Sequence, residues 1–212
     1  MKRMNAIKKI ITIGLLCIAV AVNAQQVDSA FVNAPQSVIP HIDRNAKFDL
    51  IDFYNANHSA KVRGMLESYV ELTEKRSDFL KLVLTPVSTV ELFIVPRPNG
   101  DYYILMIETV EGKAKDSYLT CFDSNWTRTD VPALTRKPGL EEFLKKRNKP
   151  KNEKVANALS SVPIAFVWAS VANDSKSLLF HLDLKGIMSE DELQSVASYF
   201  ETTIERDVKV KR

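Results

Sequence analysis

The chain has 212 residues, of which 29 are lysine or arginine and 26 are aspartate or glutamate, so its formal net charge is +3. Four of the basic residues lie within the first 24, and the remaining 188 residues carry a net charge of about −1, which gives no global electrostatic reason to expect nucleic-acid binding. The cysteines are Cys17 and Cys121, so the chain beyond residue 24 can form neither an intramolecular disulfide nor a multi-cysteine metal site.

Residues 1–24 are predicted to be a cleaved secretory signal peptide. Four basic residues precede an apolar run over 10–22, and Val22 and Ala24 supply the small side chains that signal peptidase accepts at its −3 and −1 sites. The run is shorter than the about 20 residues of a bilayer-spanning helix, which disfavours a permanent anchor. A lipoprotein signal at Cys17 is rejected because two leucines precede it. We expect an exported protein, periplasmic or cell-surface associated, with no membrane span after signal removal.

The region 25–212 is predicted to be a single α+β domain, with an antiparallel meander sheet and a few helices packed on one face. A helix over 44–56 is followed by five strand-like runs rich in β-branched and aromatic residues. The links are short, and Pro98-Asn99-Gly100 favours a tight turn, so neighbouring strands should be antiparallel. The strands are predicted at 69–74, 79–84, 89–95, 102–109 and 118–123, and the helix has an apolar face of Phe48, Leu50, Ile51 and Tyr54 opposite Asn45, Asp49 and Asp52.

The last third of the chain is predicted to add two strands and a helix. Residues 162–171 are apolar on both alternating faces, as expected of a central strand, and a second strand follows over 178–184. Ser189 and Glu192 form a capping box that begins a helix. The final residues alternate charged side chains with valine, a pattern that suits an exposed edge strand.

The basic segment 145–154, with prolines around it and a short helix near its start, leaves the domain organisation open. In one alternative it links two similar lobes, 25–130 and 155–212. A flexible, solvated linker is favoured over a site for the phosphates of lipopolysaccharide or for acidic glycans.

Few residues show the pattern of a metal, cofactor or catalytic site. His41, His58 and His181 show no metal-ligand spacing, so neither a metal nor a cofactor is predicted, and no catalytic set can be assigned. Asp49 and Asp52 lie side by side on the predicted helix, close enough to raise one pKa or to share a cation, although a solvated polar face is the simpler interpretation. The candidate binding residues are therefore Asp49, Asp52 and His41.

Strand periodicity predicts whether two further side chains are buried or exposed. Cys121 has the phase of Leu119, which predicts a buried and unreactive thiol. His181 is out of phase with its apolar neighbours and is expected to face solvent.

Several short motifs carry a resemblance through their order and spacing. They are Phe48-Asp49-Leu50-Ile51-Asp52-Phe53, Glu71-Leu72-Thr73-Glu74, Asp78-Phe79-Leu80, Val87-Ser88-Thr89-Val90-Glu91, Asp116-Ser117 and Trp126. Through them the sequence resembles a family of exported Bacteroidetes proteins of unknown function. The resemblance runs clearly from about residue 30 to 126 and implies export but no catalytic residues. Where relatives often carry two cysteines just before the Asp-Ser pair, this chain has Glu111 and Lys115, so it lacks any bridge between those positions, and the resemblance implies no redox or metal role for it.

These observations favour a non-enzymatic binding or accessory protein of the envelope, whose partner is an unknown envelope protein or glycan, with no nucleic acid. A hydrolase acting on envelope glycans or peptides is the alternative. Asp28-Ser29-Ala30 also resembles the O-glycosylation acceptor of exported Bacteroidetes proteins, and so short a pattern leaves modification of Ser29 open.

Overall fold

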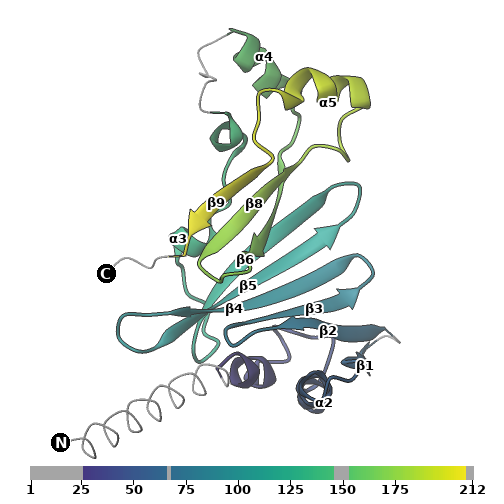
Figure 1. The fold of residues 1–212 in the computed structure, drawn as a ribbon, viewed down its shortest axis with the longest axis vertical. Helices are drawn as coiled ribbons and strands as arrows, with labels where there is room; N and C mark the ends of the chain where they lie inside the picture. Colours follow the sequence, from purple (N-terminus) through teal and green to yellow (C-terminus); the bar gives the residue numbers. More distant parts are fainter. Residues whose placement is uncertain (1–25, 66–67, 146–152, 209–212) are drawn as a thin grey trace, which may run out of the picture.

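The computed structural model describes residues 26–65, 68–145 and 153–208. The predicted signal peptide, most of the basic segment 145–154 and the last lysines of the chain lie outside the described residues. Within them, the chain forms an α+β fold with a six-stranded sheet, a three-stranded sheet and a few helices (Figure 1). The predicted fold class is confirmed.

The large sheet is an antiparallel meander in which each strand pairs with the next along the chain. All five predicted strands are present, and the additional first strand is too short for a periodic pattern to reveal. The turn at Pro98-Asn99-Gly100 is also present, with Gly100 in the left-handed region at a φ of 85°. The strands are β1 (Lys61–Arg63), β2 (Tyr69–Lys75), β3 (Phe79–Thr85), β4 (Ser88–Pro96), β5 (Tyr102–Glu111) and β6 (Lys115–Asp123).

Both faces of the large sheet are buried, as β4 illustrates. Leu92 and Ile94 belong to the core on one face, and Phe93 and Val95 belong to the core on the other. Each of these side chains is at most 1% exposed. Because side chains alternate across a strand, a continuous apolar run of this kind marks a strand that is covered on both sides.

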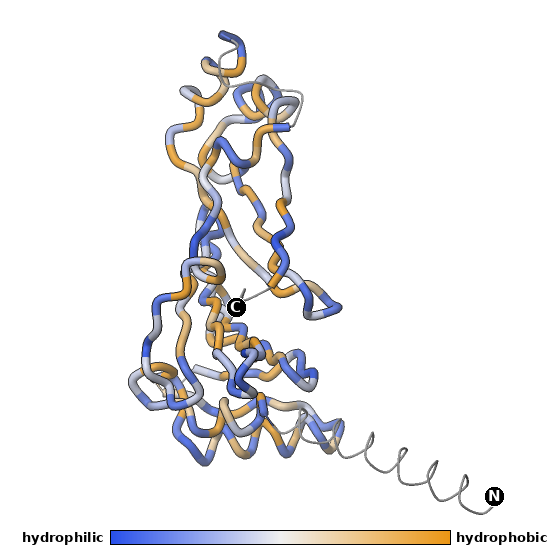
Figure 2. Tube along the Cα trace, turned by 90° about the vertical axis from the view of Figure 1, so that its left-hand side faces the viewer, coloured by the Kyte–Doolittle hydropathy of each residue, from blue (hydrophilic) through white to orange (hydrophobic). Residues whose placement is uncertain are grey.

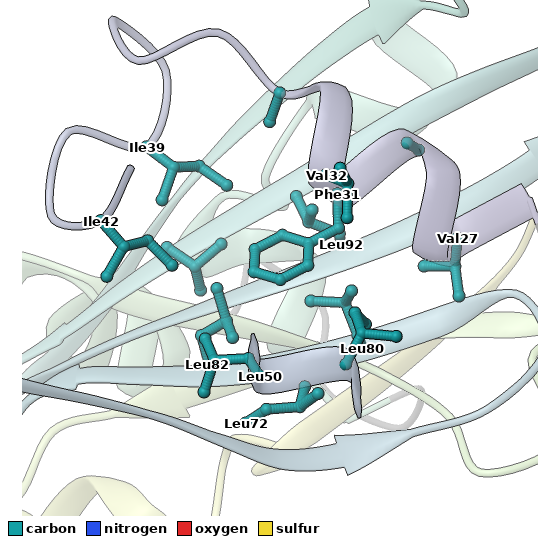
Figure 3. Packing of buried hydrophobic residues seen from close by; sticks show 14 of the residues in the cluster. Val27, Phe31, Val32, Ile39, Ile42, Leu50, Leu72, Leu80, Leu82 and Leu92 are labelled. Atoms are coloured by element: carbon teal, nitrogen blue, oxygen red, sulfur yellow. The ribbon is translucent and has the colours of Figure 1, made fainter. Parts of the chain in front are cut away.

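Two helical elements cover the first face. They are the segment 26–33 and α2 (Arg44–Asn55), and they pack on strands β2 to β5. Figure 3 shows the ring of Phe31 among Leu50, Leu82 and Leu92. Burial of one such side chain contributes about 1.5–3 kcal/mol.

The helix α2 is confirmed, except that Lys47 rather than its neighbour Phe48 is buried. Asp43 caps its start, because the Asp43 carboxylate accepts a hydrogen bond from the Ala46 N–H at 2.8 Å. Phe48 was placed on the apolar face and is 46% exposed, whereas Lys47 is only 1% exposed. The Lys47 ammonium donates to the Ala34 carbonyl at 2.7 Å, so it satisfies a buried backbone acceptor just after the segment 26–33.

The small sheet covers the second face of the large sheet. It has the order β7-β8-β9, with α5 and other short helices beside it (Figures 1 and 2). Its strands share one core with the large sheet, and Figure 2 shows hydrophobic and hydrophilic residues alternating along the chain. The elements are α3 (Pro132–Thr135), the 3-10 helix η2 (Leu140–Phe143), α4 (Glu153–Ser161), β7 (Phe166–Val171), β8 (Ser177–Asp183), α5 (Glu190–Ala197) and β9 (Thr203–Asp207).

The prediction that 162–171 forms a central strand is wrong, because β7 lies at the edge of its sheet. Its apolar character has another cause. Val167, Ala169 and Val171 pack into the core that the two sheets share, and the large sheet covers the open edge of β7. An edge strand that is buried in this way needs the same composition as a central one.

Side chains of the large sheet accept hydrogen bonds from that edge. The backbone N–H of Val167 donates to Asp116 at 3.1 Å, that of Ala169 to Ser117 at 2.9 Å and that of Val171 to Glu91 at 3.1 Å. We call these three bonds the polar seam. The acceptors are themselves held, since Ser117 bonds Thr109 and Glu91 pairs with Lys81. The seam therefore supplies acceptors for the β7 N–H groups that a neighbouring strand would otherwise supply.

The remaining predicted elements are present with small changes. The capping box of Ser189 and Glu192 begins α5, as predicted. The short helix near 140–145 is η2, and the end of the basic segment begins α4, which was not predicted. The two sheets differ in strand number, six against three.

Candidate functional site

The residues that the sequence nominated do not meet in the structure. His41 lies in the loop before α2, Asp49 and Asp52 lie on α2, and His58 is exposed after it, while His181 lies on β8 in the small sheet. None of the five main pockets of the described residues is lined by two of them. Among the same residues, no group of three or more histidine, cysteine or acidic side chains could hold a metal ion.

One of the nominated acids, however, lines a large groove. The groove lies along α2 and the segment 26–33, has a volume of about 600 Å³ and is called the helix groove below. Such a volume is within the range of small-ligand sites. Its lining combines apolar side chains (Val32, Phe48, Ile51 and Tyr102) with polar ones (Gln26, Asp28, Ser29, Asn33, Arg44 and Asp52).

The polar rim of the helix groove is partly preorganised. The Arg44 guanidinium donates to the Asn33 side-chain oxygen at 3.3 Å, and the Asn33 amide donates to Ser29 at 3.3 Å. Asp28 is held by Lys75, whose ammonium lies 2.9 Å from its carboxylate. These bonds fix side chains of both helical elements around the groove, so a ligand would meet them already oriented.

The helix α2 also presents an aromatic ring and a carboxylate in the helix groove. Phe48 is 46% exposed, and the Arg44 guanidinium lies 5.5 Å from the centre of its ring. Asp52 accepts no side-chain hydrogen bond and forms no ion pair with any described residue, so its carboxylate is available in the groove. Asp49 is exposed and does not line the groove, so the two acids of the predicted pair have different surroundings.

Sequence analysis placed Phe48 on the buried face and so missed its role in the groove. A helical wheel cannot separate the edge of an apolar face from its centre, because that depends on which neighbour arrives. The one available signal was the charge of Arg44, four residues before Phe48 and on the same side of the helix.

His41 occupies a different pocket, with a volume of about 390 Å³. Its ring nitrogen Nδ1 is buried and has no hydrogen-bond partner among the described residues. Burial raises the pKa of Glu108, and His41 opposes that shift. The two side chains therefore interact electrostatically, without a hydrogen bond between them.

His181 lies beside a smaller pocket between the sheets, which has a volume of about 170 Å³. Its ring stacks on Trp168, with the ring centres 3.8 Å apart, and Lys115 lies 4.9 Å from the centre of the Trp168 ring. Burial, and then the charge of Lys115, lower the pKa of His181. The histidine is half-buried, on the non-core face of its strand, and held by Thr203 at 3.0 Å.

Cys121 is buried in the second core, as predicted from its phase. Burial raises the pKa of its thiol to about 12. A thiolate is the nucleophilic form of cysteine, so this side chain is unreactive at neutral pH.

Together, these features define an α+β domain with two sheets on a shared core, an open amphipathic groove beside its helices, and candidate binding residues from the sequence that none of the main pockets of the described residues brings together. The chain belongs to the family described as "Protein of unknown function (DUF3256)", whose model matches residues 19–206.

A solved structure shares the fold. A domain of an uncharacterized protein from Porphyromonas gingivalis W83 matches 86% of this chain and 98% of its own length, with a TM-score of 0.73 and 17% sequence identity. A likeness at this identity shows the fold alone. Comparison with curated proteins finds no match. Within the described residues, no helix combines the length and the apolar character needed to cross a bilayer.

Several residues that carry the family resemblance hold the small sheet in place. Glu91, Asp116 and Ser117 are the acceptors of the polar seam, and Asp78 accepts a hydrogen bond from Ser175 in the turn between β7 and β8 at 3.0 Å. These motifs therefore contribute side chains that join the two sheets.

Glu111 and Lys115 face each other across the hairpin of β5 and β6. Their charged groups form an ion pair at 2.9 Å, which joins the two strands next to the turn.

Proposed function

We propose that the protein is exported and acts in the cell envelope as a non-enzymatic binding protein that holds a glycan in the helix groove. The observation that carries the proposal is the lining of that groove, in which the exposed ring of Phe48 and the largely buried aliphatic side chains of Val32 and Ile51 lie next to oriented amide, hydroxyl, guanidinium and carboxylate groups.

This lining matches the surface of a sugar ring. A pyranose has an apolar face of C–H groups and a periphery of hydroxyls, which both donate and accept hydrogen bonds. The apolar face can pack on Phe48, and the hydroxyls can reach Asn33 and Asp52. The volume of the groove, about 600 Å³, lies within the range of sites that hold drug-sized ligands, which is compatible with a short oligosaccharide.

The charges in the groove favour a neutral glycan. Arg44 and Asp52 contribute one charge of each sign, and Asp28 is neutralised by Lys75. A strongly acidic or basic polymer would therefore find no net attraction in the groove.

Export is supported by the sequence. The first 24 residues have the basic start, apolar run and small-residue end of a secretory signal. Cleavage after Ala24 would make Gln25 the mature terminus, immediately before Gln26, which lines the helix groove. Expression of the full chain in a Gram-negative host, followed by fractionation, tests this part. We expect a processed protein in the periplasmic or surface fraction, and unprocessed protein in the cytoplasm would contradict the proposal.

Glycan binding can be tested with controls that lie on the same helix. We expect neutral oligosaccharides of cell-envelope type to bind the purified chain, as measured by calorimetry. Phe48→Ala should weaken binding about tenfold, equivalent to about 1.4 kcal/mol, through loss of the stacking surface. Phe53→Ala removes a ring that is 39% exposed but does not line the groove, and it should leave the affinity unchanged.

A second matched pair tests the carboxylate. Asp52→Asn should weaken binding, whereas Asp49→Asn, with the same change of charge on the same helix, should not. Equal effects of both members of either pair would refute the groove as the site. Release of shorter sugars during the titration, abolished by Asp52→Asn, would instead support a hydrolase.

A further inference from the structure

A second pocket, at the far end of β5 from the helix groove, has an unpaired carboxylate. It has a volume of about 590 Å³ and is called the β6 pocket here. Its lining includes Glu108 and Val110 from β5 and Tyr118 and Leu119 from β6. No part of the proposed glycan site contributes to it.

The charges of the β6 pocket are not balanced. Its only lysine, Lys137, lies 2.5 Å from the carboxylate of Asp116, which also accepts the seam hydrogen bond from Val167. These two charges cancel. Glu108 forms no hydrogen bond or ion pair with any described residue and is half-buried, so the pocket has a net charge of about −1.

Burial makes that unpaired charge sensitive to a partner. An ionised carboxylate removed from water is destabilised unless a positive group approaches it. Burial raises the pKa of Glu108, and His41 is the group that acts against the shift. A bound cation would stabilise the same charge more strongly than the His41 imidazole does, because it could make direct contact, whereas His41 forms no hydrogen bond or ion pair with Glu108.

The walls around Glu108 fit the stem of a cationic group. Tyr118 is the direct cross-strand neighbour of Glu108, and its ring is 56% exposed. The Tyr118 hydroxyl accepts a hydrogen bond from Arg128 at 2.6 Å, which fixes the ring beside the carboxylate. Val110, also 56% exposed, follows on the same face of β5. A ring face, a carboxylate and aliphatic walls together are the groups that recognise an ammonium ion on an alkyl stem.

We propose that the β6 pocket binds a primary ammonium group carried on an aliphatic stem, as in a lysine side chain, with Glu108 as its counter-ion and Tyr118 as its aromatic wall. The pocket is a site separate from the helix groove, and its ligand is distinguished from a glycan by charge.

The test uses a charged probe and its uncharged analogue. Nα-acetyl-lysine amide is titrated into the isotope-labelled full chain and followed by NMR, with Nα-acetyl-norleucine amide as the analogue that lacks the ammonium. We expect the lysine derivative to shift the amides of 108–110 and 117–119 at millimolar or lower concentration, and to bind at least tenfold more tightly than the norleucine derivative. Glucosamine tests whether an amino sugar can supply the same group.

Variants on one strand provide the control. Glu108→Gln should reduce the affinity for the lysine derivative at least tenfold, and Tyr118→Ala by about threefold. Glu111→Gln makes the same change of charge three residues away, outside the β6 pocket, and should leave binding intact. Affinity should also fall between 50 mM and 500 mM salt, since the contact is between charges.

Three results would overturn the proposal. They are equal binding of the norleucine derivative, equal loss in Glu108→Gln and Glu111→Gln, and shifts that appear only at probe concentrations far above 100 mM. Circular dichroism of each variant shows whether it is folded. If Glu108→Gln fails to fold, Glu108→Met supplies the same test, because methionine removes the charge and fills a similar volume.

Discussion

Replacing Ser117 with alanine should strongly destabilise the protein, because this hydroxyl joins the two sheets. Its oxygen accepts a hydrogen bond from the Ala169 N–H at 2.9 Å and shares another with Thr109 at 2.7 Å. Ser117 is 3% exposed, and Ala169 is fully buried. Both partners are therefore largely shielded from bulk water, so the lost acceptor has no equivalent replacement.

The expected magnitude follows from the two groups that the substitution leaves without a partner. A buried donor without an acceptor costs about 1–3 kcal/mol. Ser117→Ala leaves the Ala169 N–H without an acceptor and the Thr109 hydroxyl without its partner, so we expect a loss of about 2–4 kcal/mol in the free energy of unfolding. That is a large share of the about 5–15 kcal/mol available to a typical domain.

Urea unfolding of the variant, followed by circular dichroism, measures this loss. Hydrogen exchange should show selective loss of protection at the amide of Ala169. The double variant Thr109→Val, Ser117→Ala should recover part of the stability, because it removes the stranded hydroxyl. Ser160→Ala, at an exposed position of α4, is the control and should change stability by less than about 0.5 kcal/mol. A Ser117→Ala variant within that same limit, with unchanged exchange at Ala169, would refute the role given to the seam.

Two further predictions concern positions outside the seam. Glu111→Cys with Lys115→Cys should form a disulfide in air, since the two residues face each other across an antiparallel hairpin. The disulfide should raise stability by about 2 kcal/mol, because the closed loop is short. Free thiols beyond those of the native cysteines, Cys121 among them, in an unreduced sample would contradict this. The pKa of His181 is lowered in the folded protein. As the pH falls through the ordinary value of 6.5, the unfolded state therefore binds a proton before the folded state does. The free energy of unfolding that this histidine contributes above that pH is thus lost below it. His181→Gln should therefore make the urea midpoint less dependent on pH between 7.5 and 5, and an unchanged dependence would show that another group is responsible.

Local patterns were sufficient to predict most of the large sheet. Strands β2 to β6 have alternating or continuous apolar runs separated by short turns, so both their number and their antiparallel order follow from periodicity and loop length. The capping box at Ser189 and Glu192 is equally local, because all its hydrogen bonds lie within four residues. These features depend on neighbours in sequence, which the sequence displays directly.

Features that depend on distant partners were not predictable in the same way. The run at 162–171 has the composition of a central strand, and only the arrival of Glu91, Asp116 and Ser117 from the other sheet makes it a buried edge. Lys47 is polar by sequence and buried in the fold because the Ala34 carbonyl needs its ammonium.

The candidate sites show the same limit. Asp52 was nominated from its spacing to Asp49, yet its groove depends on residues of the segment 26–33 that meet α2 only in the fold. Glu108 was not nominated from the sequence, since nothing local indicates that its carboxylate lacks a partner.

The polar seam also bears on the solubility of the domain. Exposed edge strands are sites at which proteins aggregate, because their free N–H and C=O groups can pair with a strand of another molecule. The alternate N–H groups of β7 are occupied by carboxylate and hydroxyl oxygens of the same chain, so intermolecular pairing along that edge would first require three bonds to break. The opposite edge of the sheet, β9, carries the charged residues Glu205, Arg206 and Asp207 in succession, and charged side chains on an edge strand disfavour its pairing with a strand of another molecule. The small sheet is therefore protected against self-association at one edge by hydrogen bonding and at the other by charge.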